Sequence, residues 1–384
     1  MPRFRPLLAL LIPALLAPAA RADKAPAPFR YPEGKHGKGE LKYVNGLPVL
    51  SVEGTPEEIG TQIGVLALKP ARPLLEKFFE RFVEYQGAKK IWPFVVKACG
   101  VMVRRMPEAY QKELDAMARA AGLDRDKLVV GNTILDVMKI GGCSTLVVEP
   151  GRSAGGGLLF GRNLDFPSFG LLPQFTLVTV YRPKGKHAFV SVGFPGLIGA
   201  PSGMNDAGLA MAANEIREAA DRSPHFDPEG LPMVACYRLL LEECATVAEA
   251  EKRVRKMKRS TMGSVTVCDK THGAVFEITT RSLVVRGPED GLCACTNHFR
   301  SKALAKDTRC RRYEQLKKCW EMPKLKLADV TKKLHEINQG EFTIHTMVFE
   351  PASLRLHLAF GNGPSSKLPL RVLDLAPRLR AVKK

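Results

Sequence analysis

The sequence predicts an α+β fold in which a layered sheet domain follows a mainly helical N-terminal segment. Helical periodicity dominates the first part of the chain, in pieces such as Leu74–Tyr85 and Tyr110–Ala121. After about Gly142 the pattern changes to short β-rich runs, which are separated by Gly, Pro and Asn and interrupted by amphipathic helices. Of the 384 residues, 45% are hydrophobic and 25% charged, which excludes a disordered chain. We therefore expect residues 23–142 to form the helical segment and residues 143–384 the sheet domain.

The first 22 residues have the pattern of a secretory signal peptide. Arg3 and Arg5 precede an apolar run from Leu7 to Ala17, and Ala20-Arg21-Ala22 is a small-x-small cleavage site. The apolar run is shorter than the roughly 20 residues that crossing a bilayer requires. We expect removal of residues 1–22, a secreted or periplasmic mature chain, and no integral membrane segment after cleavage. An uncleaved membrane anchor and an unstructured terminus are the alternatives.

The segment after the cleavage site predicts a linker, a hairpin and then helices. Residues 23–39 are rich in Pro, Gly and Lys, which is typical of a linker. Leu41–Val52 alternates in polarity around Asn45-Gly46, a pair that favours a β-hairpin turn. The first helix is expected to start at Thr55, whose side chain can cap it, while Glu58 can bond back to the cap.

The sheet domain is predicted from β-rich runs that alternate with amphipathic helices. Examples of the β-rich runs are Ser144–Val148, Leu158–Phe160, Thr176–Tyr181, Ala188–Val192, Leu209–Ala213, Ser264–Val267, Ala274–Ile278 and Leu354–Phe360. The helices expected between them are Pro232–Cys244, Val247–Met257 and Thr308–Trp320. There is no internal repeat and no low-complexity tract.

The net charge of +19 favours acidic partners without identifying one. The densest basic cluster, residues 252–259, is broken by Val254 and Met257 and is typical of a solvated helix face. Basic residues are not interleaved with exposed aromatics, and no nucleic-acid motif is present. We expect no nucleic-acid partner.

Common catalytic and metal motifs are absent from the sequence. The eight histidines are scattered, and there is no HExxH and no GxxxxGK[ST]. Cys293-x-Cys295-x-x-His298 resembles half of a metal site, but the other half is missing. Buried thiols or disulfide partners explain these cysteines better, so we expect neither a metal nor a cofactor.

One segment stands out as a site of chemistry. Gly141 and Gly142 directly precede Cys143, which opens a strand, and Gly161-Arg162-Asn163-Leu164-Asp165 follows after a glycine-rich turn at residues 153–157. Pairing of the two strands would bring Cys143 close to Arg162 and Asp165. A free cysteine is more often a small buried apolar residue, so composition alone does not make Cys143 catalytic.

The segments around these residues resemble the acyl-coenzyme A:6-aminopenicillanic acid acyltransferase family, whose relatives include the choloylglycine hydrolases. Both belong to the N-terminal nucleophile hydrolases. The matching segments are Gly142–Thr145, Gly161–Asp165, Gly203–Leu209, Ala213-Asn214, Thr296–Phe299 and His345–Pro351. They follow the order of the family within a resemblance that runs from roughly Glu57 to Gly361.

The resemblance implies a four-layer αββα sandwich over residues 143–384 and a chain that cuts itself before the nucleophile. Here the cut would fall between Gly142 and Cys143, and residues 23–142 would stay associated with the core. Cys143 would then supply both a thiol nucleophile and, through its new α-amine, a base. Gly142 suits such a bond because a residue without Cβ permits close attack.

The resemblance also carries roles to four further residues. Asp165 would orient and polarise the amine or thiol, and Arg162 would hold the thiolate; a structural ion pair is their alternative. Asn214 and the side-chain NH₂ of Asn297 would contact the oxyanion; otherwise they are strand-end or turn residues. The family has one more arginine downstream, for which Thr308-Arg309-Cys310-Arg311-Arg312 offers three candidates.

The activity that the resemblance implies is hydrolysis of a linear N-acyl amide, a small molecule, through a thioester acyl-enzyme. Transfer of the acyl group to an amine, and a non-catalytic member that binds an acylated ligand, are the alternatives. A conventional Cys-His thiol protease is a third. Leu171-Leu172, the run 194–198 and Met204 either line an acyl pocket or belong to the core, and the core is the better interpretation. The acyl chain, the leaving amine and the oligomeric state stay open.

Overall fold

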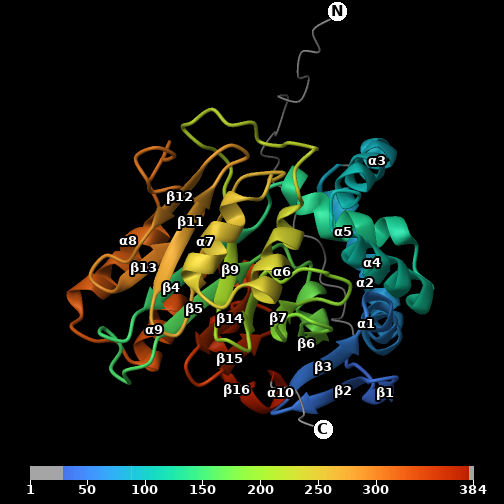
Figure 1. Cartoon of the computed structure of the whole chain (residues 1–384), viewed down its shortest axis with the longest axis horizontal. Coiled ribbons are helices and arrows are strands. Elements are labelled where there is room, and N and C mark those ends of the chain that lie inside the picture. The colour runs from blue at the N-terminus through green and yellow to red at the C-terminus, as the bar shows by residue number, and fades with distance from the viewer. Residues whose placement is uncertain (1–28, 88, 380–384) are drawn as a thin grey trace, which may run out of the picture.

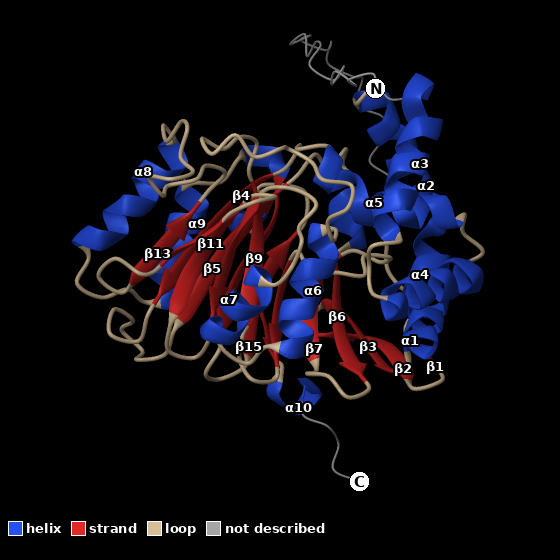
Figure 2. Ribbon diagram, turned by 45° about the horizontal axis from the view of Figure 1, so that its top comes forward, coloured by secondary structure: helices blue, strands red, loops and turns tan. Residues whose placement is uncertain are grey.

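The protein is a sandwich of two β-sheets covered by helices on both outer faces. The computed structural model describes residues 29–87 and 89–379, and the expected signal peptide lies outside that part of the chain. A ten-stranded and a six-stranded sheet stack face to face (Figure 1, Figure 2). One hydrophobic cluster lies between the sheets, and others lie between each sheet and its helices. This arrangement confirms the four-layer αββα fold.

The larger sheet contains both the N-terminal hairpin and most of the central strands. Its order is β1-β2-β3-β6-β7-β8-β9-β10-β11-β12, and all neighbours are antiparallel except β3 and β6. The strands are β1 (Gly34–His36), β2 (Gly39–Val44), β3 (Leu47–Gly54), β6 (Leu177–Pro183), β7 (Phe189–Gly193), β8 (Ser202–Asn205), β9 (Ala210–Glu215), β10 (Gly263–Cys268), β11 (Gly273–Ile278) and β12 (Leu283–Arg286).

The smaller sheet carries the segment that contains Cys143. Its order is β13-β4-β5-β14-β15-β16, with every pair antiparallel. The strands are β4 (Gly142–Val148), β5 (Leu159–Asp165), β13 (Leu292–Cys295), β14 (Thr343–Glu350), β15 (Arg355–Phe360) and β16 (Arg371–Asp374). Alternation along β4 sends Val147 to the core between the sheets and Leu146 to the outer core, because successive side chains point to opposite faces.

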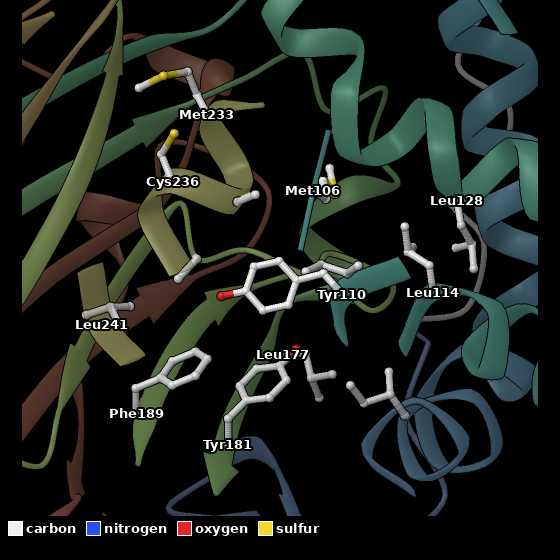
Figure 3. Packing of buried hydrophobic residues seen from close by; sticks show 14 of the residues in the cluster. Met106, Tyr110, Leu114, Leu128, Leu177, Tyr181, Phe189, Met233, Cys236 and Leu241 are labelled. Carbon is white, nitrogen blue, oxygen red and sulfur yellow. The ribbon is translucent and has the colours of Figure 1, made fainter. Parts of the chain in front are cut away.

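Helices complete the two outer layers. The helices are α1 (Pro56–Ile63), α2 (Lys69–Tyr85), α3 (Trp92–Val103), α4 (Glu108–Ala121), α5 (Arg125–Val137), α6 (Met233–Glu243), α7 (Val247–Arg255), α8 (Arg311–Lys317), α9 (Leu327–Glu336) and α10 (Ala376–Leu379). The first seven pack against the larger sheet, and Figure 3 shows part of that core, where Tyr110 of α4 meets Tyr181 and Phe189. Helices α8 and α9 cover the smaller sheet. Among the described residues, no helix is long and apolar enough to cross a membrane.

The local predictions for the N-terminal segment are confirmed in part. Asn45 and Gly46 form the hairpin turn between β2 and β3, both with positive φ, and the Thr55–Glu58 capping box starts α1. The linker prediction is wrong from Tyr31 onward. Tyr31 is buried, its hydroxyl donates to the Phe175 carbonyl at 2.8 Å, and β1 pairs with β2. A short polar strand with a glycine turn looks like a linker when its partner strand is not known.

The sheet domain follows the predicted runs closely. Each predicted β-rich run coincides with a strand of the structure to within two residues at its start, and α6 and α7 match the expected helices closely. The last expected helix, Thr308–Trp320, is shorter than predicted, because α8 begins at Arg311 and a 3₁₀ turn follows it. The helical segment and the sheet domain share one sheet and one core, and a cut between them at residue 142 stays a prediction.

Candidate active site

Cys143 lies at the start of β4, on the face that looks into the sandwich. It pairs in register with Leu164 of β5, and Thr145, on the same face, meets Thr266 of the opposite sheet with 2.7 Å between their hydroxyl oxygens. The residue is 4% exposed. Burial raises the pKa of the Cys143 thiol above its ordinary value, and the charges of Asp165 and Glu215 add to the rise. A proton acceptor close to the thiol would therefore be needed to form the thiolate.

Arg162 is on the same face of the sheet as Cys143. Thr145 pairs with Arg162, so the guanidinium stands two positions along from the thiol. Its charge and hydrogen bond act to lower the pKa of the thiol, against the larger effect of burial. Its Nε donates to Ser202 Oγ at 2.7 Å, whereas Nη1 is buried and has no partner among the described residues. The predicted closeness of Arg162 and Cys143 is confirmed.

Asp165 is also close, but on the opposite face of β5. It pairs with Gly142, so it lies beside the peptide bond that precedes Cys143. Its carboxylate accepts hydrogen bonds from Gln339 Nε2 at 2.6 Å and Thr343 Oγ1 at 2.5 Å, and lies 3.7 Å from the guanidinium of Arg312. Residues 162 and 165 are an odd number of positions apart, so they cannot share one face of a regular strand.

Asn297 contacts the backbone of Cys143. Its Oδ1 accepts from the Cys143 N–H at 2.9 Å and from Arg312 Nη2 at 2.7 Å, and its Nδ2 donates to the Glu215 carbonyl at 2.8 Å. These partners fix which side-chain atom is oxygen and which is nitrogen. We expected the side-chain NH₂ of Asn297 to point to the oxyanion. In the structure this NH₂ donates to the Glu215 carbonyl, and only the side-chain oxygen of Asn297 faces Cys143.

Arg312 is the downstream arginine that the sequence could not select. Its Nη1 donates to the Cys143 carbonyl at 2.6 Å and to Ser144 Oγ at 3.0 Å. Arg309 instead pairs with Asp307 at the surface, where its side chain is 91% exposed, and Arg311 is exposed as well. Arg312 alone among the three candidates reaches the site, because α8 begins at Arg311 and turns the next residue inward.

The Asn214 side chain lines the same cavity as the Cys143 thiol. It stands on β9, is 1% exposed, and neither Nδ2 nor Oδ1 has a partner among the described residues. A buried polar group without a partner is costly, so such a group in a folded protein calls for an explanation. Asn214, Arg162 and Cys143 line one cavity, so two unpaired donors stand ready for a ligand oxygen beside the thiol.

Three charged residues near the site were missed by the sequence reasoning. Glu215 is partly buried and accepts the Gly141 N–H at 2.6 Å through Oε2. Lys139 donates to the Met262 carbonyl at 2.9 Å, and Asp136 accepts from Ser260 Oγ at 2.6 Å. Burial raises the pKa of Glu215 and of Asp136 and lowers that of Lys139. Their sequence signal is weak, since none of the three belongs to a recognisable motif.

A second cavity joins the one that contains Cys143. This apolar cavity lies between α2, α5 and the loops after β5 and β7, and its only polar lining residues are Glu76, Lys127 and Asn132. The residues shared with the Cys143 cavity are Gly131, Asn132, Leu135, Leu164, Phe166, Leu197 and Pro201. Leu172 and residues 194–197 line the apolar cavity, whereas Leu171, Ile198 and Met204 are core residues. Of the residues predicted to line an acyl pocket or to belong to the core, some therefore line the apolar cavity and the others belong to the core.

Among the described residues, no histidine makes a hydrogen bond to the Cys143 thiol. His345 is buried and its Nε2 lies 2.8 Å from Thr176 Oγ1; burial, with the charge of Arg162, lowers its pKa to about 3. Burial also lowers the pKa of His298. Cys293 and Cys295 are buried on β13, and the described residues hold no group of three metal-ligating side chains. A neutral His345 is a packing residue.

Known proteins resemble the chain in sequence and in structure. An uncharacterized protein of Archaeoglobus fulgidus is 24% identical over 273 residues, which are 63% of this chain and 45% of that protein, so the chain spans about half the length of this relative. One similar solved structure is the Caenorhabditis elegans ortholog of N-acylethanolamine-hydrolyzing acid amidase, which is 18% identical in sequence. The match covers 54% of this chain and 93% of that chain, with a TM-score of 0.43. Conjugated bile acid hydrolase from Clostridium perfringens is 15% identical, and the match covers 61% of this chain and 93% of that chain, with a TM-score of 0.43.

Penicillin V acylase from Agrobacterium tumefaciens is a further similar structure, with 13% identity, 57% and 83% coverage and a TM-score of 0.36. The sequence profile of the family described as acyl-coenzyme A:6-aminopenicillanic acid acyl-transferase matches residues 152–364, more than half of the 384-residue chain. The matched region begins after Cys143 and includes Arg162, Asp165, Asn214 and Asn297. The chain therefore belongs to the acyl-coenzyme A:6-aminopenicillanic acid acyl-transferase family.

Proposed function

We propose that the protein is a self-processed cysteine amidohydrolase that cleaves linear N-acyl amides through a thioester. One observation carries the proposal: the Cys143 thiol shares a cavity with the unpaired donors of Asn214 and Arg162, and this cavity opens into an apolar one. A nucleophile, a place for a developing oxyanion and a place for an acyl chain are thereby adjacent.

Self-cleavage would begin with attack of the Cys143 thiol on the carbonyl carbon of Gly142. The C–N bond breaks as the C–S bond forms, the nitrogen takes the thiol proton, and water then hydrolyses the thioester to release a Gly142 carboxylate and the thiol. Gly142 fits this position because a Cβ there would lie 2.2 Å from Gln339 Nε2. Asn297 and Arg312 hold the N–H and carbonyl of Cys143, which fixes the residue that attacks.

Turnover would use the α-amine that cleavage creates. Ordinary pKa values of about 7.7–8.0 for an α-amine and 8.5 for a thiol allow the amine to accept the thiol proton. The thiolate adds to the substrate carbonyl, whose oxygen is held by Asn214 Nδ2 and Arg162 Nη1. Collapse returns the proton to the leaving amine, and water releases the acid from the acyl-thioester.

Two readouts on the purified protein test the proposal. Denaturing electrophoresis should show two pieces, and the larger one should start at Cys143 by terminal sequencing. Cys143→Ala should abolish both cleavage and amidase activity. Cys310→Ala should change neither, because the Cys310 side chain makes no capping hydrogen bond at the start of α8. An intact wild-type chain, or an active Cys143→Ala protein, would overturn the proposal.

Acyl transfer is the second candidate function, and the family's own description favours it. It differs only in the acceptor, because an amine in place of water would attack the same acyl-thioester. Addition of amine acceptors to the assay should then divert product from free acid to a new amide. A binding protein without catalysis would instead retain acylated ligand and leave the Gly142–Cys143 bond intact.

Export of the mature chain is also proposed, on the sequence of residues 1–22. The N-terminal piece of the protein purified from the producing cell should start near Asp23, and fractionation should place the protein outside the cytoplasm. A full-length chain in the cytoplasm would contradict this part of the proposal.

A further inference from the structure

Helix α3 has an unusual composition for its place in the molecule. Its twelve residues, Trp92–Val103, contain a single charged side chain, Lys97. It nevertheless lies at the outer edge of the protein, beyond α2 and α5 (Figure 1, Figure 2). Cys99, Met102 and Val103 face the core, so the outward face should be polar in an ordinary surface helix.

The outward face is apolar instead. Phe94 is 74% exposed, and Ile91 and Tyr85 in the preceding turn and helix are 50% and 61% exposed. They are three of the most exposed large hydrophobic side chains of residues 29–87 and 89–379, and all lie within ten positions of one another. A cluster of this kind on a soluble protein marks a surface that meets another apolar phase. We call Tyr85, Ile91 and Phe94 the α3 patch.

Unpaired cations lie on the same stretch of chain as the α3 patch. Lys90, Lys97 and Arg104 are exposed, and none of them is paired with a carboxylate of the described residues. Two neighbouring acids are engaged, since Glu84 pairs with Lys89 and Glu229 with Arg105, and Glu80 in the groove beside Trp92 is the one without an ion pair among the described residues. Exposed aromatic and aliphatic side chains flanked by free lysine and arginine match a lipid surface with anionic headgroups.

The α3 patch also adjoins the route to the thiol. Trp92, the first residue of α3, lines a surface groove with Lys89, and this groove shares Glu76, Phe79 and Lys127 with the apolar cavity. The apolar cavity in turn shares its inner residues with the Cys143 cavity. Three adjacent hollows that share lining residues therefore lie between the α3 patch and the candidate nucleophile.

We propose that the α3 patch docks the protein on an anionic lipid surface, from which an acyl amide passes through the groove into the apolar cavity. The second half of this statement rests on the proposed function, and the docking itself does not. Helix α3, about 18 Å long, is too short to span a bilayer and would lie in the interface. Positive charge would draw the protein to the surface, and the apolar side chains would insert.

Vesicle flotation tests the docking with the processed wild-type protein. Binding to phosphatidylcholine vesicles that contain phosphatidylglycerol should exceed binding to phosphatidylcholine alone and should fall with added salt. The double variant Ile91→Ser and Phe94→Ser should lower the partition coefficient at least about tenfold. Leu368→Ser with Val372→Ser, an exposed apolar pair far along the chain, should leave the coefficient unchanged.

The charged part of the surface has its own matched pair of variants. Lys90→Gln, Lys97→Gln and Arg104→Gln together should remove the preference for anionic vesicles. Lys302→Gln, Lys324→Gln and Lys332→Gln, which neutralise three exposed cations elsewhere, should not. Equal effects of the two triples would mean that net charge alone is responsible and would overturn the docking site.

The outcomes separate the docking from the amidase function. Cys143→Ala should still bind vesicles while hydrolysing nothing, and the α3-patch variant should keep wild-type rates on a soluble short-chain amide but lose them on a vesicle-borne long-chain amide. Wild-type vesicle binding by the α3-patch variant overturns the docking and leaves the amidase function standing. Loss of a concentration-dependent dimer in that variant, without any vesicle binding by the wild type, would show that the α3 patch joins two copies and would also overturn it.

Discussion

Replacement of Asn214 is expected to lower the activity of the protein without lowering its stability. Its buried amide has no partner among the described residues, so its removal breaks no internal hydrogen bond. Asn214→Ala should leave the melting temperature nearly unchanged. Turnover should fall by a factor on the order of 10²–10³, because one donor to the oxyanion is lost.

Asn205 supplies the matched control for that prediction. Its Nδ2 donates to the Leu241 and Cys244 carbonyls at 3.0 and 2.7 Å, and its Oδ1 accepts from two backbone N–H groups of the turn after β8. Asn205→Ala should therefore lower the melting temperature while the folded fraction keeps its turnover number. The opposite pattern in the two variants would contradict an oxyanion role for Asn214.

Arg312 should matter for the reaction, while its neighbour Arg309 should not. Arg312 joins the Cys143 carbonyl to the Asn297 side chain, and misplacement of a reacting group by about 1 Å can cost on the order of a hundredfold in rate. Arg312→Ala should slow both self-cleavage and turnover by about that factor. Arg309→Ala should match the wild type, and rates should be followed by electrophoresis and by an amidase assay. Wild-type cleavage in Arg312→Ala would refute the positioning role.

His345 predicts a specific loss of stability in acid. Burial lowers its pKa to about 3, while an unfolded histidine has a pKa near 6.5. The unfolded chain therefore binds the proton first, so the stability that the neutral ring contributes is complete above about pH 6.5 and is lost as the pH falls towards 3. In urea unfolding, His345→Gln should flatten this dependence. The exposed His36→Gln should follow the wild type, and an unchanged slope in His345→Gln would contradict the prediction.

The sequence identified most of the residues that the structure gathers around Cys143, though their roles stay predictions. Arg162 and Asp165 could be placed because two strands joined by a glycine-rich turn must pair. The face on which each side chain lies follows from the exact register, which local patterns do not determine. Glu215 and Lys139 escaped notice because their meaning comes from burial, which depends on strands and helices far away in the chain.

At the scale of elements, an ion network joins the two sides of the proposed cut. Arg238 of α6 donates to both carboxylate oxygens of Glu113 on α4, at 2.8 and 2.7 Å, and to Glu242 at 2.6 Å, all of them buried. Strand β3 adds a six-residue parallel ladder with β6. The two pieces of a cleaved chain should therefore co-elute in native size exclusion and separate only on denaturation.

Glu113→Ala tests that network. Removal of one partner leaves part of a buried charge uncompensated, which typically costs about 3–5 kcal/mol of unfolding free energy. Glu108 on the same helix makes only an exposed ion pair with Lys112, so Glu108→Ala should leave the unfolding free energy close to that of the wild type. Denaturant unfolding measures both. Similar values for the two variants would mean that the buried network does not hold α4 to α6.

The elements themselves were partly visible in the sequence. Long alternating or periodic runs such as Ala274–Ile278 and Val247–Met257 were found, because burial of one face imposes the period. Strand β8 was missed because it has only four residues. The pairing of β13 with β4 was missed too, because residues so distant in the chain leave no local pattern. Pairing of this kind is decided by the packing of the whole sandwich.

At the scale of the whole molecule, the junction of the two cavities should set the length of the acyl chain. Gly131, within α5, lines both cavities, and a Cβ there would point at the Phe79 ring, 3.4 Å away. Gly131→Met would add four heavy atoms, Cβ, Cγ, Sδ and Cε, at the junction. Activity on long acyl chains should then fall at least about tenfold, because one or two buried methylenes are worth about that factor. Short-chain amides should keep wild-type kcat/KM.

Gly131→Ala is the control that separates a blocked cavity from a disturbed helix. Alanine should stabilise α5 by about 1 kcal/mol over glycine and should reach the cavity with a single methyl group. The acyl-length profile of Gly131→Ala should therefore stay close to that of the wild type, while the profile of Gly131→Met shifts to shorter chains. An equal loss at every chain length in Gly131→Met would mean that the acyl chain takes another path. The two cavities would then have to be assigned to different parts of the substrate.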